Sequence, residues 1–210
     1  MAPTATHITE YDRAAPDGDS VETATFALGC FWGPDAQFGS LDGVVRTRVG
    51  YAGGTKAEPT YHDLGDHTEA FQVEYDPEQR SFRELLELVF RGHDPTKQTR
   101  KTQYQNIVFV TTPGQRETLS AFLETRGDTA EGIATRIEQH PRFYSAEDYH
   151  QKYSLRNKRA IMDAFEAAGY DDEEIRESPA AAKLNGCAAG HDLPADTDLG
   201  IADNRTVYSP

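Results

Sequence analysis

The chain has 210 residues, of which 37% are hydrophobic and 27% are charged. No apolar run approaches the roughly 18 residues that a membrane-spanning helix needs, so the composition excludes a transmembrane protein. The length favours one globular domain, and residues 1–22 lack the continuous apolar stretch of a secretion signal. We therefore expect a cytoplasmic protein.

The net charge of −14 is concentrated at the two ends of the chain, because residues 1–22 carry −4 and residues 171–210 carry −6. A field of this sign repels phosphate groups and no basic stripe interrupts it, which argues against nucleic acid and anionic membranes as partners. Both ends are rich in Asp, Ala, Pro, Ser and Gly and lack sustained periodicity. We predict an acidic N-terminal tail at 1–22, a globular domain at 23–170 and an acidic C-terminal tail at 171–210.

In chain order, strand patterns lie at 23–28, 44–50, 69–75, 107–111 and 133–138. The helix signals are Gly33-Pro34 before a helix that leads to Leu41, a capping box at Ser81 to Glu84, Thr112-Pro113 before a helix that Gly127 ends, and patterns after Ser145 and over 159–168. The Gly-rich stretch 50–66 has no element signal, and loops of that length are usually functional or disordered.

The first four predicted strands and the two helices between them follow the order β-α-β-β-α-β. This order is typical of the split β-α-β unit of ferredoxin-like folds. The sequence therefore predicts an α+β protein, a ferredoxin-like two-layer α/β sandwich with long loops and an extended C-terminal tail.

Cys30 is the residue best placed for chemistry. It lies between the predicted end of a strand and the predicted start of a helix, where unpaired backbone N–H groups and the helix dipole stabilise a thiolate. This position predicts a lowered thiol pKa and a nucleophile. The alternative is an inert, buried cysteine. Glycines on both sides of the Cys-Phe-Trp triplet instead favour close approach of a substrate to the backbone.

The segment Gly29-Cys30-Phe31-Trp32-Gly33 resembles the signature of the A-class peptide methionine sulfoxide reductases, which reduce the S epimer of methionine sulfoxide. The resemblance spans residues 23–155, most of the predicted globular part. Six further blocks resemble family blocks in family order: Gly50-Tyr51-Ala52-Gly53-Gly54, Pro59-Thr60-Tyr61, Asp66-His67-Thr68-Glu69-Ala70, His93-Asp94-Pro95, Thr102-Gln103-Tyr104 and Ala146-Glu147-Asp148-Tyr149-His150-Gln151.

Reduction of a sulfoxide by a thiolate requires a proton donor or hydrogen-bond donors for the departing oxygen. Glu69 is the candidate acid, because a strand-end position among apolar neighbours favours a raised pKa that keeps the carboxyl group protonated near neutrality. Tyr61 and Tyr104 are the candidate hydroxyl donors. The alternatives are a solvated strand-end carboxylate for Glu69 and half-buried aromatic residues with hydroxyls in water for the tyrosines.

Phe31 and Trp32 are expected to bound an apolar pocket for the substrate methyl group, although aromatic residues beside a strand are ordinarily part of a core. His150 and Tyr153 are three residues apart on a predicted helix and so share a face. The resemblance implies that both lie at the rim of the substrate pocket, while a surface or hydrogen-bonded histidine is the alternative for His150. The seven histidines and two cysteines lack the spacing of zinc ligands, so no metal is implied.

Attack by Cys30 on a sulfoxide leaves a sulfenic acid, which must condense with a second thiol to be recycled. Cys187 is the only other cysteine, and the small residues of 185–190 suit a mobile arm that carries this thiol. The alternative is an incidental tail cysteine. The resemblance implies that thioredoxin or a similar external dithiol reduces the resulting disulfide. No bound cofactor is implied, and we expect a monomer.

The sequence departs from the family pattern just before Thr102-Gln103-Tyr104. Family members commonly carry an Asp five residues before the tyrosine, where this chain has Thr99. The resemblance implies that this Asp helps to arrange the pocket, so we expect its loss to affect rate and substrate preference. Two functions therefore compete: a working reductase of free or protein-bound methionine sulfoxide, and a protein of the same fold that binds oxidised methionine, or senses oxidant through Cys30, without efficient turnover.

Overall fold

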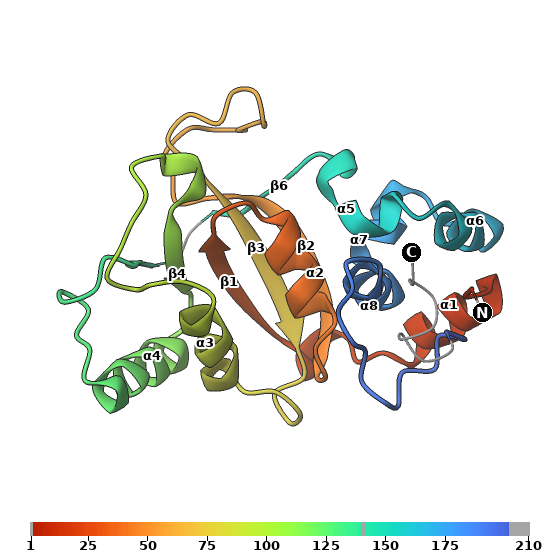
Figure 1. Ribbon diagram of the computed structural model, residues 1–210, viewed down its shortest axis with the longest axis horizontal. Helices are drawn as coiled ribbons and strands as arrows, with labels where there is room; N and C mark the ends of the chain where they lie inside the picture. The colour runs from red at the N-terminus through yellow and green to blue at the C-terminus, as the bar shows by residue number, and fades with distance from the viewer. Residues whose placement is uncertain (1, 140–141, 202–210) are drawn as a thin grey trace.

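The computed structural model describes residues 2–139 and 142–201. Within these residues the chain forms eight α-helices and a six-stranded mixed sheet of order β5-β4-β1-β3-β2-β6 (Figure 1). The prediction of an α+β protein is confirmed. None of the helices in the described residues is long and apolar enough to cross a membrane. The strands are β1 (Glu22–Leu28), β2 (Val44–Ala52), β3 (Thr68–Tyr75), β4 (Asn106–Val110), β5 (Arg136–Gln139) and β6 (Tyr144–Ser145).

The four central strands are antiparallel and have the order β4-β1-β3-β2. Strand β3 is thus inserted between β1 and β2, which are joined through helix α2 (Trp32–Gly39), while α3 (Phe82–Arg91) joins β3 to β4. This is the strand order that a split β-α-β unit requires. Strand β5 extends the sheet parallel to β4, and the short β6 pairs with the other edge at β2.

Two helices begin at the capping residues that the sequence predicts. The Ser81 side chain accepts a hydrogen bond from the Glu84 N–H, and the Glu84 side chain accepts one from the Ser81 N–H, which completes the capping box of α3. At the start of α4 (Pro113–Arg126) the Thr112 side chain accepts a hydrogen bond from the Gln115 N–H, and that helix ends at Gly127. These local signals explain why the boundaries of α3 and α4 are predictable.

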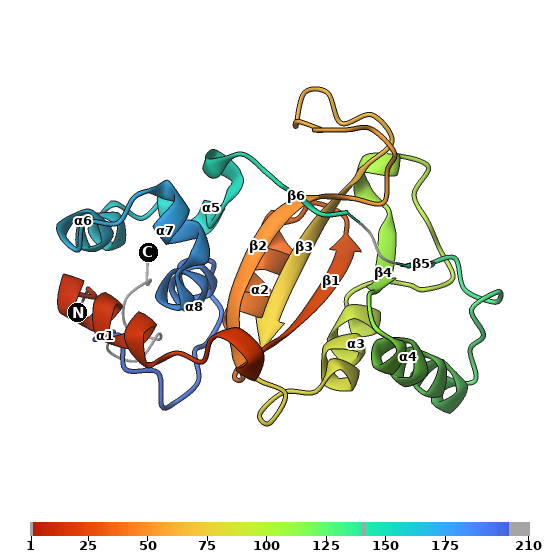
Figure 2. The ribbon, with the colours of Figure 1, turned by 180° about the vertical axis from the view of Figure 1, so that it is seen from behind.

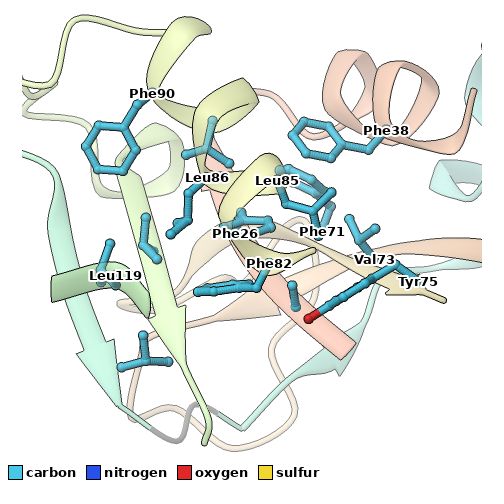
Figure 3. Packing of buried hydrophobic residues seen from close by; sticks show 14 of the residues in the cluster. Phe26, Phe38, Phe71, Val73, Tyr75, Phe82, Leu85, Leu86, Phe90 and Leu119 are labelled. Carbon is cyan, nitrogen blue, oxygen red and sulfur yellow. The ribbon is translucent and has the colours of Figure 1, made fainter. Parts of the chain in front are cut away.

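A core of aromatic and aliphatic side chains fills the space between the sheet and helices α2 and α3 (Figure 3). Phe26 of β1 stacks on Phe82 of α3 with ring centroids 5.9 Å apart, and it also contacts Phe38 of α2 and Phe71 of β3. All four rings are buried. Helix α2 is therefore held against the sheet along its length, which fixes the turn that precedes it.

A second hydrophobic cluster lies beside the sheet and joins the two ends of the chain (Figures 1 and 2). It buries Ile8, Leu155, Phe165 and Leu184. The helices that meet here are α1 (Ala5–Ala14), α5 (Tyr153–Arg156), α6 (Arg159–Ala167), α7 (Asp172–Glu177) and α8 (Pro179–Ala188).

The prediction of unstructured tails is therefore wrong for α1, α7 and α8. Small residues in α8 serve close helix contact instead of flexibility: a Cβ atom at Gly186 would lie 2.5 Å from the Cβ of Ser40 and 2.7 Å from the carbonyl oxygen of Ala36. Only glycine permits α8 to approach α2 so closely. The end of the predicted C-terminal tail, residues 202–210, lies outside the described residues.

Candidate active site

Cys30 lies in the turn between β1 and α2. Gly29 adopts a φ of +72°, a left-handed conformation that glycine tolerates without strain, and this turn brings the chain from the sheet into the helix. Cys30 is exposed, and the backbone N–H of Trp32 donates a hydrogen bond to its sulfur. The thiol is thus accessible and interacts with the first turn of α2.

The predicted lowering of the Cys30 pKa is wrong for this structure. Partial burial raises the pKa of the thiol and the charge of Glu69 raises it further, against the lowering effect of the Trp32 N–H. A helix N-terminus favours a thiolate, but desolvation and a neighbouring carboxylate outweigh it here. Cys30 is therefore mainly a neutral thiol near pH 7, and its titration is coupled to that of Glu69.

Glu69 is the second residue of strand β3, directly after the long loop, and is only 1% exposed, which excludes a solvated strand-end carboxylate. Its Oε2 accepts a hydrogen bond of 3.1 Å from the Phe31 N–H, and its Oε1 accepts one of 2.7 Å from Nε2 of Gln103. Burial raises the pKa of Glu69, while these two bonds and the charge of Lys101 oppose the rise. The predicted direction of the pKa shift is confirmed.

The two tyrosines come from separate segments and meet beside Cys30. Tyr104 ends the short 3-10 helix η2 (Thr102–Tyr104), and Tyr61 lies in the loop between β2 and β3. Burial raises the pKa of Tyr104, and the nearby ionisable groups of Glu69, Tyr61 and Cys30 raise it further. A hydrogen bond with the Tyr61 side chain acts in the same direction. The four predicted catalytic groups of the globular domain are therefore brought together.

Aromatic side chains form a wall next to the thiol. The rings of Trp32 and Tyr153 stack with centroids 3.9 Å apart and planes at 8°, and the indole N–H of Trp32 donates a 3.2 Å hydrogen bond to Nδ1 of His150. Phe31 contacts the His150 ring edge-on at 5.2 Å. The prediction that His150 and Tyr153 lie on one helix is wrong. The left-handed backbone at Lys152 separates the 3-10 turn η3 (Asp148–His150) from α5. Both nevertheless contact Trp32.

Glu147 is a site residue to which the sequence reasoning gave no role. Its Oε1 accepts a 2.9 Å hydrogen bond from the Tyr61 N–H, and its Oε2 accepts one of 2.7 Å from the Tyr51 hydroxyl. Although burial acts to raise it, these bonds hold the pKa of Glu147 below its usual value. Glu147 thus fixes the loop that carries Tyr61. The signal was present, since Glu147 lies in one of the blocks that resemble the family.

Thr99, which stands where the family commonly has an Asp, makes hydrogen bonds only within its own loop in the described structure. Its hydroxyl accepts a hydrogen bond from the Lys101 N–H, and its carbonyl accepts one from the Gln105 side chain. The side chain that reaches Glu69 from this segment is Gln103. Lys101 lies over the ring of Tyr104 at 4.4 Å, which adds a positive charge to this side of the site.

Cys187 does not lie in a mobile arm. It belongs to α8 and is 1% exposed, and burial raises the pKa of its thiol. Helix α8 packs on α2: Ala182 lies against Gly39 at the end of α2, and Asn185 Nδ2 donates a 2.9 Å hydrogen bond to Asp35 Oδ2 near its start. No disulfide joins Cys30 and Cys187.

Comparison with known proteins gives matches over most of the chain. The family described as "Peptide methionine sulfoxide reductase" matches residues 22–181. The chain is 42% identical over 185 residues to peptide methionine sulfoxide reductase A5 of rice (Oryza sativa subsp. japonica), and this match covers 84% of this chain and 71% of the relative. It is 40% identical over 171 residues to peptide methionine sulfoxide reductase of Drosophila melanogaster, and this match covers 80% of this chain and 68% of the relative.

Among solved structures, methionine sulfoxide reductase A of Corynebacterium diphtheriae is 31% identical, with a TM-score of 0.56 and coverage of 74% of this chain and 82% of that one. The chain belongs to the peptide methionine sulfoxide reductase A family and is a methionine sulfoxide reductase.

Proposed function

We propose that this chain reduces the S epimer of methionine sulfoxide, free or within proteins, to methionine, and so repairs oxidised proteins. The observation that carries the proposal is the meeting of an exposed thiol, a buried carboxyl group of raised pKa and two hydroxyls at one place. Sulfoxide reduction needs a nucleophile at sulfur and a proton donor at oxygen. Cys30 supplies the first, and Glu69 with Tyr61 and Tyr104 supplies the second.

The reaction begins when Glu69 takes the proton of the Cys30 thiol. The thiolate then attacks the sulfoxide sulfur, while protonated Glu69 and the hydroxyls of Tyr61 and Tyr104 stabilise the oxygen. The oxygen passes to the Cys30 sulfur, so that the substrate gains two electrons and leaves as methionine, and Cys30 becomes a sulfenic acid. Cys30 and Glu69 share one proton, which moves from the thiol to the carboxyl group and then acts on the sulfoxide oxygen. Sharing is possible because the pKa values of both groups are raised.

The aromatic wall supplies the apolar surface for the substrate. The partly buried Trp32 faces the methyl group and the buried Phe31 supports the wall from the core, while His150 and Tyr153 hold the Trp32 ring by a hydrogen bond and by stacking. A methyl group on the wall and an oxygen at Glu69 fix two of the substituents on the sulfoxide sulfur. This arrangement favours one configuration at that sulfur.

Cys187 resolves the sulfenic acid in this proposal. Its thiol attacks the Cys30 sulfur, a disulfide forms and water leaves, after which an external dithiol such as thioredoxin reduces the disulfide. Cys187 is buried in α8 whereas Cys30 is exposed, so the last turn of α8 must open before the two sulfurs can meet. Asn185, two residues before Cys187, bonds Asp35 in the first turn of α2, so the last turn of α8 lies against that helix, and Gly186 and Gly190 lie within three residues of Cys187.

The wild-type protein with dithiothreitol is expected to consume the S epimer of methionine sulfoxide and to leave the R epimer unchanged. The reason is that only one configuration puts the oxygen at Glu69 while the methyl group contacts Trp32. Chiral chromatography of the residual sulfoxide measures both epimers in one reaction. Equal loss of both would contradict the proposed geometry, and no thiol-dependent loss of either would remove the proposed activity.

Cys187→Ser is expected to complete the first turnover and then stop when thioredoxin is the reductant, because the sulfenic acid has no partner thiol. The measurement is the amount of methionine formed per enzyme, first without reductant and then with thioredoxin and its reductase. Ala188→Ser is the matched control, since it adds a hydroxyl to the same turn and keeps the thiol. Undiminished cycling of Cys187→Ser would exclude the resolving role and leave the first step intact.

A further inference from the structure

A buried polar network joins four elements one turn below Trp32. Its members are Asp35 of α2, Thr47 of β2, Lys152 before α5 and Asn185 of α8, and each of the four residues is fully buried. Asp35 Oδ1 accepts a hydrogen bond from the Thr47 hydroxyl and lies 3.6 Å from Nζ of Lys152, while Oδ2 accepts the bond from Asn185. Nζ of Lys152 also donates to the carbonyl oxygen of Thr47.

Such a network is sensitive to geometry. A buried charge pair persists only where its hydrogen-bonding partners are well placed, because neither charge has water to replace a lost contact. The Asp35–Lys152 pair therefore fixes the segment around Lys152 relative to the first turn of α2. The mechanism described above uses neither residue.

Lys152 stands between the two residues that hold Trp32. His150 precedes it and accepts the indole hydrogen bond, and Tyr153 follows it and stacks on the indole ring. Lys152 itself has a φ of +52°, a left-handed conformation that is unfavourable for a residue with a Cβ atom. Such a conformation persists where the surroundings impose it. Here the surroundings are the buried contacts of the Lys152 side chain and those of Gln151 before it, whose side chain makes buried hydrogen bonds to β2.

We propose that Lys152, held by Asp35, is a positioning residue that keeps His150 and Tyr153 against Trp32 and thereby shapes the methyl-binding wall. Asp35 is three residues after Trp32 on the same helix, so the pair connects the two sides of the wall directly. Without the pair, the chain at position 152 is free to leave the left-handed conformation, and His150 and Tyr153 lose their common orientation. The effect on catalysis rests on the proposed function, whereas the effect on the Trp32 environment does not.

Lys152→Met tests the proposal, since methionine retains an unbranched side chain of similar length and removes the charge. Trp32 is the only tryptophan of the chain, so tryptophan fluorescence reports the wall alone. We expect emission at longer wavelength and stronger quenching by acrylamide. For the S sulfoxide we expect kcat/KM to fall by about tenfold or more, with KM carrying most of the change, because the Cys30 and Glu69 geometry is untouched.

Lys183→Met is the matched control. Lys183 is a second buried lysine, and its Nζ donates to the carbonyl oxygens of Gly39, Leu41 and Val44 at the opposite end of α2. Its replacement should lower the thermal stability of the protein as Lys152→Met does, and should leave Trp32 fluorescence and KM at wild-type values. The same fluorescence and KM changes in both variants would show a general loss of packing and overturn the proposal.

The double variant Asp35→Asn/Lys152→Met is a second test. It is needed if Lys152→Met alone does not fold because the charge of Asp35 is left buried without a partner. The double variant removes both charges together, and we expect it to fold with the same fluorescence change and raised KM. A folded variant of either kind with wild-type fluorescence and KM overturns the proposal. If the wild type proves inactive, the proposed function fails, and the fluorescence comparison still decides the role of Lys152.

Discussion

Cys30→Ser is expected to abolish the thiol-dependent reduction of the S sulfoxide, a loss of at least about 10⁴-fold in kcat/KM. A serine hydroxyl ionises far less readily than a thiol and cannot take up the sulfoxide oxygen as a sulfenic acid does. The measurement is methionine formed with dithiothreitol as reductant. Because Cys30 is exposed and lies outside the hydrophobic core, its replacement should not impair folding.

The control for Cys30→Ser is Cys187→Ser, which keeps the first turnover. Tryptophan fluorescence of Cys30→Ser should match that of the wild type, which shows that the wall beside residue 30 is intact. Residual reduction at the wild-type rate would show that Cys30 is not the nucleophile. If the wild type itself binds the sulfoxide without turning it over, the alternative function, a binder or oxidant sensor of the same fold, is the correct one.

Glu69→Gln is expected to lower kcat/KM by about 10²- to 10⁴-fold, because the amide keeps the shape of the side chain and can neither accept the thiol proton nor deliver it to the sulfoxide oxygen. The pH profile should also change shape. In the wild type, activity falls at high pH when the shared proton is lost from the Cys30–Glu69 pair, and at low pH when both groups are protonated. In Glu69→Gln only the thiolate reacts, so the rate should rise with pH and then level off.

Thiol titration gives a readout of Glu69→Gln that does not depend on activity. The Glu69 charge raises the pKa of Cys30, so the pKa of this thiol should be lower in the variant than in the protein with Glu69. Thiolate absorbance measures it in a Cys187→Ser background, where Cys30 is the only cysteine. An unchanged pKa and an unchanged pH profile would exclude the coupling between the two groups.

Gln103→Leu is the matched comparison, because it keeps the carboxyl group and removes one hydrogen bond to it. That bond lowers the pKa of Glu69, so its removal should raise this pKa and move the acid limb of the pH profile to higher pH. A charge-assisted hydrogen bond of roughly 1.5–3 kcal/mol corresponds to a displacement of about 1–2 pH units. A displacement toward lower pH would contradict the proposed role of the bond.

The sequence predicts the central fold because its signals there are local. The Ser81 capping box and the Thr112-Pro113 start depend on contacts within three or four residues, and alternation along β2 and β3 reflects the two faces of one sheet. The position of Cys30 is predictable for the same reason, since a strand end, Gly29 and a helix start adjoin it in the chain.

The features that could not be predicted from the sequence depend on contacts between residues far apart in the chain. The helix-terminus argument for Cys30 considers only neighbouring N–H groups, whereas its pKa is decided by burial and by Glu69, which is 39 positions away. The roles of Gln103 and Glu147 likewise depend on partners far along the chain. In α8, small residues are compatible with either a flexible tail or a close helix contact, and only the fit of Gly186 against α2 distinguishes the two.

The deep placement of the second sulfur imposes an order of events on this protein. A hydrogen peroxide molecule or an alkylating agent that arrives from solvent meets the sulfur at position 30, while the one at position 187 is sealed inside a helix contact. In the proposed resolving role, the same contact delays pairing of the two sulfurs, because the helix must first fray. The burial of the inner thiol thus keeps it from reagents in solvent while the outer one stays accessible.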